Sequence, residues 1–272
     1  MRHFYVAHLH PLNPETPFRP KNITQIESGL GDFQPRVSDL CSSVLIASKV
    51  EYHKTQTSPL IRSTMYTPKF NQVTDRSLLI ETMRAYSFAV IFGPVGAPDI
   101  AGPQVATHLP LVVKDEGEHG IIEGHFAKAN NHWQVLAGRE TLIVFSGPHS
   151  YVSPALYVGP LSVPTWNYIA VHAYGMLELV EDDAGKSALL AGLIEANDPA
   201  YGEKWREMPD GFRHSMLAGI VGFRIRIARL EGKFKLSQNR PEADRRNVHA
   251  AHAAGTPDQQ ALASWMDRLA GC

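Results

Sequence analysis

The sequence predicts an α+β fold in which a small antiparallel barrel is accompanied by peripheral and C-terminal helices. Three observations lead to this prediction. Five or six segments have the apolar runs or the alternation of β-strands, and turn-rich segments join them as in antiparallel sheets. One helix-like segment precedes the strands, and most of the others come late in the chain. Strands and helices do not alternate regularly, which argues against a parallel βαβ sheet.

The ordered part of the chain is expected to begin at Met65. Asp75 is a good helix N-cap, and Leu78, Leu79 and Met83 follow it at near-helical spacing, so a helix is expected over 75–86. The next elements alternate between apolar segments and turns. We expect strands at 87–92, 105–113, 121–126 and 141–145, a loop at 93–98, a hairpin connection at 115–120 and a short helix or turn at 127–135.

The stretch 146–180 has two unlike halves. The first is turn-rich, because four prolines between 148 and 164 forbid a continuous helix. The second alternates from Trp166 to Val180, with one aliphatic face and one face of aromatic rings and the His172 imidazole. Such aromatic side chains most often fill a barrel core. A rigid loop that leads into an aromatic strand would also suit the edge of a planar, polar ligand.

The C-terminal third adds one more strand and several helices. The strand 222–234 carries Phe223, Ile225 and Ile227 on one face, and then the alternation slips by one residue, which predicts a β-bulge near Ala228. Helices are expected at 184–196, 201–205, 212–217, 242–253 and 258–269.

Composition narrows the class of protein. The chain has 272 residues, 44% hydrophobic and 19% charged, with a formal net charge of −1. These values are typical of a globular protein and give no global electrostatic reason to bind nucleic acid or an anionic membrane. No apolar run approaches the roughly 20 residues that cross a bilayer, so no membrane contact is expected. Two distant cysteines favour neither a disulfide framework nor a cysteine zinc site, and the default location is the cytoplasm.

Residues 1–64 differ from the rest of the chain. They contain six prolines and show no sustained period, and only 43–50 resembles a short strand. We interpret them as a mostly disordered extension, or as translated sequence upstream of a true start at Met65. The domain prediction is therefore an extension at 1–64, one domain at 65–250 and a helical tail at 251–272.

Three polar clusters are candidates for chemistry: 107–110, 124–133 and 231–240. A strand ends and a turn begins within 124–130, where free N–H groups suit a phosphate, and the amides, hydroxyl and cations of 231–240 suit one equally well. A surface strand edge, a capped junction and a solvated loop are the structural alternatives. No metal site is predicted. The histidines at 249 and 252 are expected on a solvated helix face, and no catalytic motif is recognised.

Several multi-residue motifs of this chain resemble the PaiB family, FMN-binding "negative transcriptional regulator" proteins of the flavin split-barrel group. They occur in family order between Met65 and about Val248. The matching motifs are Met65–Phe70, Thr107–Pro110, Gly124–Asn130, Gly147–Pro154, Val163–Tyr168, Val171–Gly175 and Glu231–Arg240.

The resemblance implies an antiparallel split β-barrel like that of pyridoxamine-phosphate oxidase, a homodimer with FMN at its interface, and repression of gene expression. DNA control would be direct or through a partner. Two alternatives remain open: an FMN-dependent oxidoreductase that acts on a small molecule, and heme binding with His125 or His172 as ligand. The cofactor-binding residues that the resemblance implies are His108, His125, Asn130, Ser153, Trp166, Asn167, His172, Lys235 and Gln238.

Overall fold

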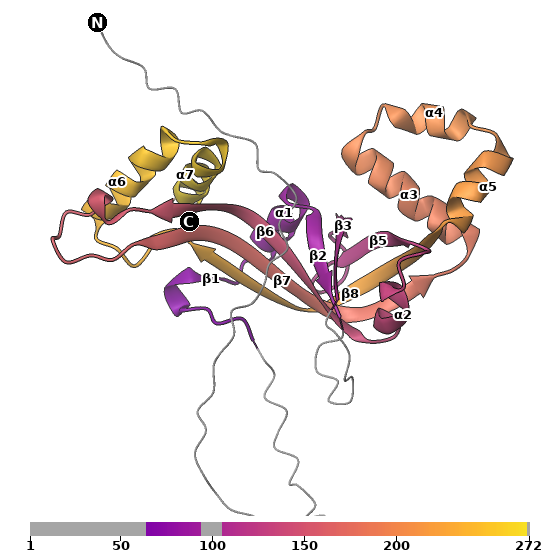
Figure 1. Cartoon of the computed structure of the whole chain (residues 1–272), viewed down its shortest axis with the longest axis horizontal. Coiled ribbons are helices and arrows are strands. Elements are labelled where there is room, and N and C mark those ends of the chain that lie inside the picture. Colours follow the sequence, from indigo (N-terminus) through magenta and orange to yellow (C-terminus); the bar gives the residue numbers. More distant parts are fainter. Residues whose placement is uncertain (1–63, 94–104, 271–272) are drawn as a thin grey trace, which may run out of the picture. The chain divides into compact units, whose positions relative to one another are not determined.

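The structure is a computed structural model that describes residues 64–93 and 105–270 (Figure 1). The predicted extension up to residue 63, its short strand at 43–50 and nearly all of the loop at 93–98 lie outside the described residues. The predicted domain boundary at residue 250 falls within a C-terminal helix.

One antiparallel sheet organises the described part of the chain. Its strand order is β3-β2-β6-β7-β8-β5-β4, and β1 pairs with the second half of β8. The strands are β1 (Gln72–Val73), β2 (Phe88–Phe92), β3 (Ala106–Pro110), β4 (Val112–Lys114), β5 (Ile121–Ala127), β6 (Glu140–Val152), β7 (Thr165–Val180) and β8 (Ile220–Lys235).

The two edge strands of this sheet are consecutive in the sequence. The sequence predicts one strand over 105–113, but the structure divides it at Leu111 into β3, at one edge of the sheet, and β4, at the other. Pro110 has no N–H to donate, and the Leu111 N–H donates to the carbonyl of Ser87 at 3.0 Å. Because a single residue joins the two edge strands, the sheet curls into the split barrel that the resemblance implies.

The interior of the barrel is mainly aliphatic. Along β7 the odd-numbered residues Asn167, Ile169, Val171 and Ala173 are buried, whereas Trp166 on the opposite face is 52% exposed. The interpretation of the β7 aromatic face as barrel core is therefore wrong. The inner faces of the sheet supply the core instead, including Ile91, Ile122, Phe126, Ile143, Phe145, Val171, Phe223, Ile225 and Phe234.

Two irregularities shape the long strands. The predicted turn-rich start of 146–165 is wrong up to Val152, because β6 continues through it and accommodates Pro148 at a register shift between Ser146 and His149. In β8 the predicted bulge is confirmed: Tyr174 of β7 pairs with Arg229 and Gly175 pairs with Ile227, so Ala228 is the extra residue.

Helices lie at both ends of the long strands, as Figure 1 shows. At one end α3 (Asp183–Asn197), α4 (Tyr201–Glu207) and α5 (Asp210–Ala218) form one group; at the other α6 (Glu242–Ala253) contacts α7 (Pro257–Ala270), which packs on β6. The remaining helices are α1 (Arg76–Ala85), α2 (His132–Leu136), and the 3₁₀ turns η1 (Lys69–Asn71) and η2 (Pro154–Leu156). Within the described residues no helix is both long and apolar enough to cross a membrane.

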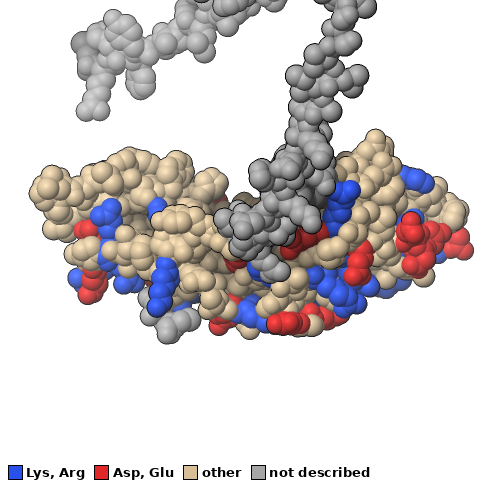
Figure 2. All heavy atoms as spheres, turned by 90° about the horizontal axis from the view of Figure 1, so that it is seen from below, with Lys and Arg blue, Asp and Glu red and all other residues tan. Residues whose placement is uncertain are grey.

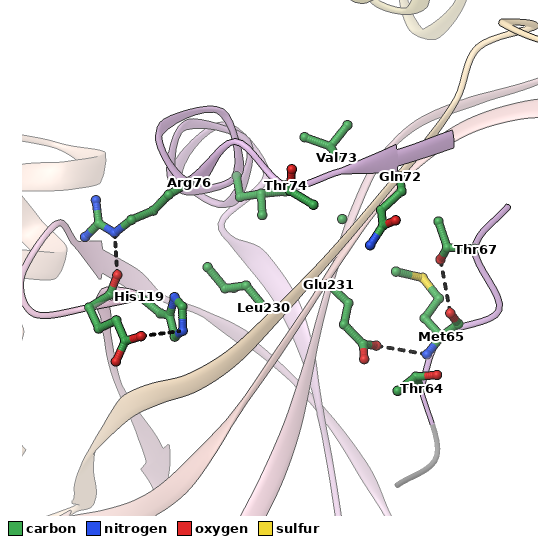
Figure 3. A pocket seen from close by; sticks show the side chains of 13 residues that line it. Thr64, Met65, Thr67, Gln72, Val73, Thr74, Arg76, His119, Leu230 and Glu231 are labelled. Carbon is green, nitrogen blue, oxygen red and sulfur yellow. Dashed lines mark hydrogen bonds and ion pairs between the residues drawn. The ribbon is translucent and has the colours of Figure 1, made fainter. Parts of the chain in front are cut away.

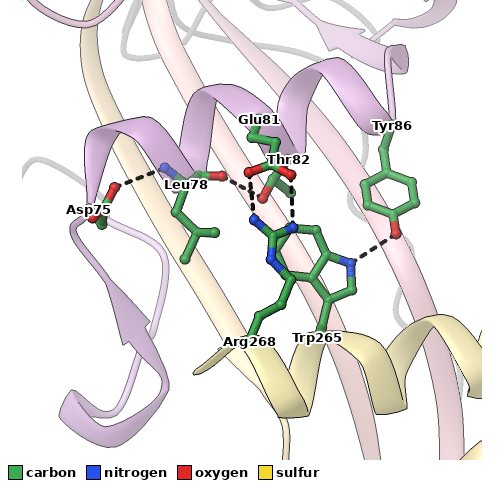
Figure 4. A network of polar contacts seen from close by, with 7 residues as sticks. All are labelled: Asp75, Leu78, Glu81, Thr82, Tyr86, Trp265 and Arg268. Atoms are coloured by element: carbon green, nitrogen blue, oxygen red, sulfur yellow. Dashed lines mark hydrogen bonds and ion pairs between the residues drawn. The ribbon is translucent and has the colours of Figure 1, made fainter. Parts of the chain in front are cut away.

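Polar contacts fasten α7 to α1 (Figure 4). The predicted N-cap is confirmed, since the Asp75 carboxylate accepts from the N–H of Leu78 at 2.8 Å. Arg268 donates to both carboxylate oxygens of Glu81 at 2.8 and 2.6 Å, and the Trp265 indole donates to the Tyr86 hydroxyl at 3.1 Å. The C-terminal helix is thus part of the same packed unit as the first helix.

Candidate functional site

A small polar cavity lies where β7 begins and β8 ends. We call it the Lys235 pocket. Its volume is about 100 Å³, the share of roughly three water molecules in the liquid. Hydroxyls, amides and cations line it together with Val163 and Pro164; the polar lining residues are Thr165, Asn167, Lys235, Ser237, Asn239 and Arg240.

Local sequence explains how these groups meet. Lys235 lies opposite Tyr168 in the β7–β8 ladder, and the chain then turns sharply at Ser237, which has a left-handed φ of 65°. The Gln238 side chain holds this turn: its Oε1 accepts from the N–H of Leu236 at 2.7 Å, and its Nε2 donates to the carbonyl of Phe234. Gln238, predicted to bind the cofactor, here shapes the turn that carries Asn239 and Arg240.

The pocket carries positive charge that no acidic side chain of the described residues compensates. The Lys235 ammonium donates to the Thr165 hydroxyl and, at 2.7 Å, to the Trp166 carbonyl. The third of its three N–H donors has no hydrogen-bond partner among the described residues. Burial, and then the charges of Lys233 and Arg240, lower the pKa of Lys235. Within residues 64–93 and 105–270 no carboxylate forms an ion pair with Lys235 or Arg240. A bound anion would relieve this repulsion.

The polar floor of the pocket is fully buried. Asn167 is 0% exposed, and its Oδ1 accepts from the Ser237 hydroxyl at 3.1 Å. On its other side the Asn167 Nδ2 lies 3.4 Å from Nε2 of His252, which is 1% exposed. The expectation that His252 lies on a solvated helix face is therefore wrong, because α6 turns this residue toward β7.

An aromatic ledge adjoins the pocket on the outer face of the sheet. Trp166 follows Thr165 directly, and its ring centroid lies 6.0 Å from that of Tyr151 and 6.2 Å from that of His149. The Trp166 ring is half exposed, so this ledge can receive a flat group. Ser153, near the same end of β6, caps η2, since its hydroxyl accepts from the N–H of Ala155 at 3.2 Å.

The second predicted phosphate site, the junction after β5, has a different character. The Asn130 amide donates to the Thr107 hydroxyl at 3.3 Å and accepts from the His132 N–H at 3.1 Å. The same hydroxyl lies 2.8 Å from Nδ1 of His132, and the Lys128 N–H donates to the carbonyl of Gly219 at 2.9 Å. The Thr107 hydroxyl, the Asn130 amide and the Lys128 N–H are thus used within the chain, whereas Nε2 of His132 is buried without a hydrogen-bond partner among the described residues.

Distance separates the junction from the Lys235 pocket. Gly124 of β5 lies opposite Phe223, twelve residues before Lys235 on β8. At about 3.3 Å per residue, those twelve residues of strand measure roughly 40 Å. His125 and Asn130 therefore cannot contact the same small ligand as Lys235 within one chain.

Three predicted histidines lie on the outer face of the sheet. His108 is exposed on β3 and stacks on Phe88, whereas His172 lies three strands away on β7, about 14 Å at the usual strand spacing. Burial lowers the pKa of both His172 and His125. The Nδ1 atoms of His125 and His172 are buried, with no hydrogen-bond partner among the described residues.

A larger cavity of about 440 Å³ lies beside α1 and β1 (Figure 3). Its charged side chains are already engaged: Arg76 pairs with Asp115 at 2.5 Å, and Glu231 accepts from the Met65 N–H at 2.9 Å. This cavity contains none of the residues predicted to bind the cofactor. Among the described residues no group of three or more His, Cys, Asp or Glu could hold a metal ion.

Of the residues predicted to bind the cofactor, Asn167 and Lys235 line the Lys235 pocket, and Trp166 and Gln238 lie beside it. Other parts of the sheet carry His108, His125 and His172, and Asn130 follows β5. Sequence reasoning missed the roles of Thr165 and His252. Thr165 stood in a recognised motif, and the helical spacing of Asp244, Val248 and His252, all buried, was the signal for an inward face of α6.

A family model and a curated relative each match most of this chain. A family model described as "Putative FMN-binding domain" matches residues 65–229. The "Protease synthase and sporulation protein PAI 2" of Bacillus subtilis is 35% identical over 189 residues, which cover 68% of this chain and 87% of that protein.

Solved structures with a related arrangement are more distant. The flavocytochrome Anf3 of Azotobacter vinelandii is 15% identical, with a TM-score of 0.46 over 61% of this chain and 69% of its own. The FAD and heme binding protein of Mycobacterium smegmatis is 16% identical, with a TM-score of 0.46 over 61% of this chain and 73% of its own.

Proposed function

The chain belongs to the FMN-binding domain family, and from that premise we propose that it holds FMN by its phosphate in the Lys235 pocket. The observation that carries this proposal is the pair of cations, Lys235 and Arg240, that have no acidic partner among the described residues and share a cavity with hydroxyl and amide donors. Charge-assisted hydrogen bonds from such a set are the usual means of holding a phosphate.

The rest of the cofactor has a place beside the pocket. Trp166 follows Thr165 in β7, so a ligand anchored by its phosphate at Lys235 reaches the Trp166, Tyr151 and His149 ledge directly. Bound FMN supplies a redox-active ring. This chain's residues hold the phosphate, offer a flat aromatic surface and keep the pocket floor dry.

The outer face of the sheet supports a homodimer as part of the proposal. Four large side chains on it are about half exposed or more: Phe88 at 65%, Trp166 at 52%, Tyr151 at 49% and Met176 at 48%. Exposed apolar groups gathered on one sheet face mark an interaction surface. A second copy on this face would cover the aromatic ledge and would bring the partner's sheet close to the cofactor.

We propose that the protein regulates gene expression through a partner rather than by direct contact with DNA. The basic residues of β8 are mostly engaged: Arg224 pairs with Glu123 at 2.6 Å, Arg229 pairs with Glu231, and Lys233 donates to the Tyr66 carbonyl at 2.7 Å. Basic and acidic side chains intermingle on the face that Figure 2 presents. The helices over 183–218 contain four Lys or Arg against six Asp or Glu. A cytoplasmic location belongs to the same proposal, since a regulator of transcription acts there.

Binding of FMN and of riboflavin, which lacks the phosphate, tests the pocket. Titration of the purified full chain should show tighter binding of FMN than of riboflavin. Lys235→Met should weaken FMN binding about tenfold or more, since a hydrogen bond to a charged group contributes about 1.5–3 kcal/mol, and leave riboflavin binding unchanged. Lys204→Met, an exposed lysine on α4, is the matched control. Equal affinities for the two flavins in the wild type would contradict the proposed phosphate site.

The same preparation separates the alternative functions. Bleaching of bound FMN by NAD(P)H with turnover of an acceptor would favour the oxidoreductase, and a Soret band after addition of heme, without flavin binding, would favour the heme protein. A sequence-dependent DNA shift that weakens with salt would overturn regulation through a partner.

Light scattering tests the dimer. Phe88→Glu places a charge on an exposed apolar position, so it should convert a dimer to a monomer without unfolding the chain. Phe212→Glu, at an exposed aromatic of α5, is the control and should leave the dimer intact. A wild type that is monomeric at micromolar concentration would refute this part of the proposal.

A further inference from the structure

We propose that His252 is a positioning residue for the Lys235 pocket, so that helix α6 completes the phosphate site. The inference rests on the proposed function of that pocket. It starts from the buried chain of contacts that joins Ser237, Asn167 and His252, three residues from separate segments of the molecule.

The chain of contacts has a defined direction. The Asn167 Oδ1 accepts from the Ser237 hydroxyl at 3.1 Å, so the Nδ2 of the same amide is the group that faces His252. An amide nitrogen can only donate, and therefore the His252 Nε2 must accept, which requires a neutral ring with its proton on Nδ1. Burial favours that neutral form, because it lowers the pKa of His252, and the nearby His249 lowers it further.

Because the three residues are buried, the loss of one contact should disturb the others. Asn167, Ser237 and His252 are all less than 5% exposed, so the loss of a partner leaves a buried polar group unsatisfied. Without an acceptor at position 252, the Asn167 Nδ2 has no partner on that side, and the amide would rotate. The Asn167 Oδ1 would then move away from the Ser237 hydroxyl, which would lose its acceptor. Both Asn167 and Ser237 line the pocket, so its donor set would change although neither residue was altered.

Several contacts fix α6 where this role requires it. Asp244 accepts from the Val158 N–H at 2.8 Å, and Asn247 donates to the Leu156 carbonyl at 3.0 Å. Gln259, at the start of α7, donates to the Ser150 hydroxyl at 3.0 Å. The helix pair is therefore anchored to the end of β6 and the loop after it, close to the strand that carries Asn167.

The test compares FMN with riboflavin in variants of the full chain. His252→Leu keeps the volume and removes the acceptor, so FMN affinity should fall about tenfold, the cost of one buried polar partner, with riboflavin affinity unchanged. His252→Gln restores an acceptor and should return FMN affinity to within about threefold of the wild type, a difference of less than 1 kcal/mol. His249→Gln, on the same helix and paired with Asp267, is the matched control.

The outcomes distinguish this inference from the proposed function. If the wild type prefers FMN and Lys235→Met abolishes the preference, but His252→Leu leaves it intact or weakens both flavins equally, the positioning role is refuted while the pocket stands. Should His252→Leu fail to fold, Ser237→Gly breaks the same chain of contacts at a residue whose left-handed backbone suits glycine. That variant must then lose the FMN preference, and an unchanged preference overturns the inference.

Discussion

The junction after β5 and the Lys235 pocket look alike in the sequence and differ in the structure. Both combine a strand end, a turn, amides and a lysine. At the junction, the Thr107 hydroxyl contacts both the Asn130 amide and Nδ1 of His132, and Asn130 accepts from the His132 N–H. In the pocket, two cations remain without acidic partners in the described part of the chain. Lys128 of the junction is also unpaired among the described residues, but it is exposed. The pocket differs because two unpaired cations and neutral donors meet in one cavity, and this is the arrangement that we propose for an anion.

Removal of the second cation should give the largest effect. Arg240→Met takes away a guanidinium that lies 4.0 Å from the Tyr157 ring centroid and faces the pocket. We expect FMN affinity to fall about ten- to a hundredfold, since a charge-assisted contact contributes about 1.5–3 kcal/mol. The melting temperature without ligand should change little, because the loss of the Tyr157 contact and the relief of repulsion on Lys235 oppose each other. A marked loss of stability would mean that the Tyr157 contact outweighs the repulsion.

A change at the junction should lower the stability of the protein and leave its FMN affinity unchanged. Thr107→Val keeps the shape of the side chain but leaves the Asn130 amide and His132 Nδ1 without their shared partner. The free energy of unfolding should fall by about 1–3 kcal/mol, the cost of a buried unsatisfied polar group. Denaturant unfolding measures this, with Thr74→Val, at an exposed position, as control. Intact FMN affinity in the folded variant would support the contrast, and a selective loss of FMN binding would break it.

Acid should destabilise both regions through their histidines. Burial lowers the pKa of His132 and of His252 below the value of about 6.5 in an unfolded chain. The unfolded state therefore binds more protons just below that pH, and stability falls as the pH drops from about 7 through the folded-state pKa values. The melting temperature should decrease over this window, and His132→Asn combined with His252→Gln should make the decrease shallower. A slope that the double variant does not alter would assign acid sensitivity to other groups.

The smallest effect is expected at Lys128. This residue is exposed, and only its backbone N–H and carbonyl are used, by Gly219 and by the Trp133 indole. Lys128→Met should change FMN affinity by less than about twofold, well under 1 kcal/mol. A tenfold loss would show that the junction binds the phosphate. Because the junction and the Lys235 pocket are far apart within one chain, the junction would then contact a cofactor bound by the partner subunit.

Much of the fold could be predicted because its signals are local. The Asp75 cap, the alternation of β7 and the phase slip at Ala228 each need only a few neighbouring residues, and the structure confirms all three. The features that were missed depend on distant partners. The break at Leu111 requires Ser87, and the continuation of β6 through Pro148 requires the pairing of β6 with β7 on both sides of the bulge.

The site was predictable in part for the same reason. Asn167 and Lys235 stand in recognised motifs, and the structure places them in one pocket. That Gln238 holds a turn could not be read from the sequence, because it depends on hydrogen bonds that the turn itself creates. The spacing of Asp244, Val248 and His252 indicates an inward face of α6, but the contact of His252 with Asn167 of β7 depends on the tertiary fold. The aromatic face of β7 was assigned to the core because composition does not reveal which side of a sheet is covered.

The extra residue at Ala228 decides which face of the sheet each later side chain of β8 occupies. Before it, the arginines at even positions 224 and 226 lie on the outer face; after it, the odd positions 229, 231, 233 and 235 do. Deletion of this one alanine would invert every later side chain of the strand. Phe234 would leave the core, and the ammonium groups of Lys233 and Lys235 would enter it. The extra residue therefore determines whether Lys233 and Lys235 lie on the outer face, beside the proposed phosphate site, or point into the apolar core.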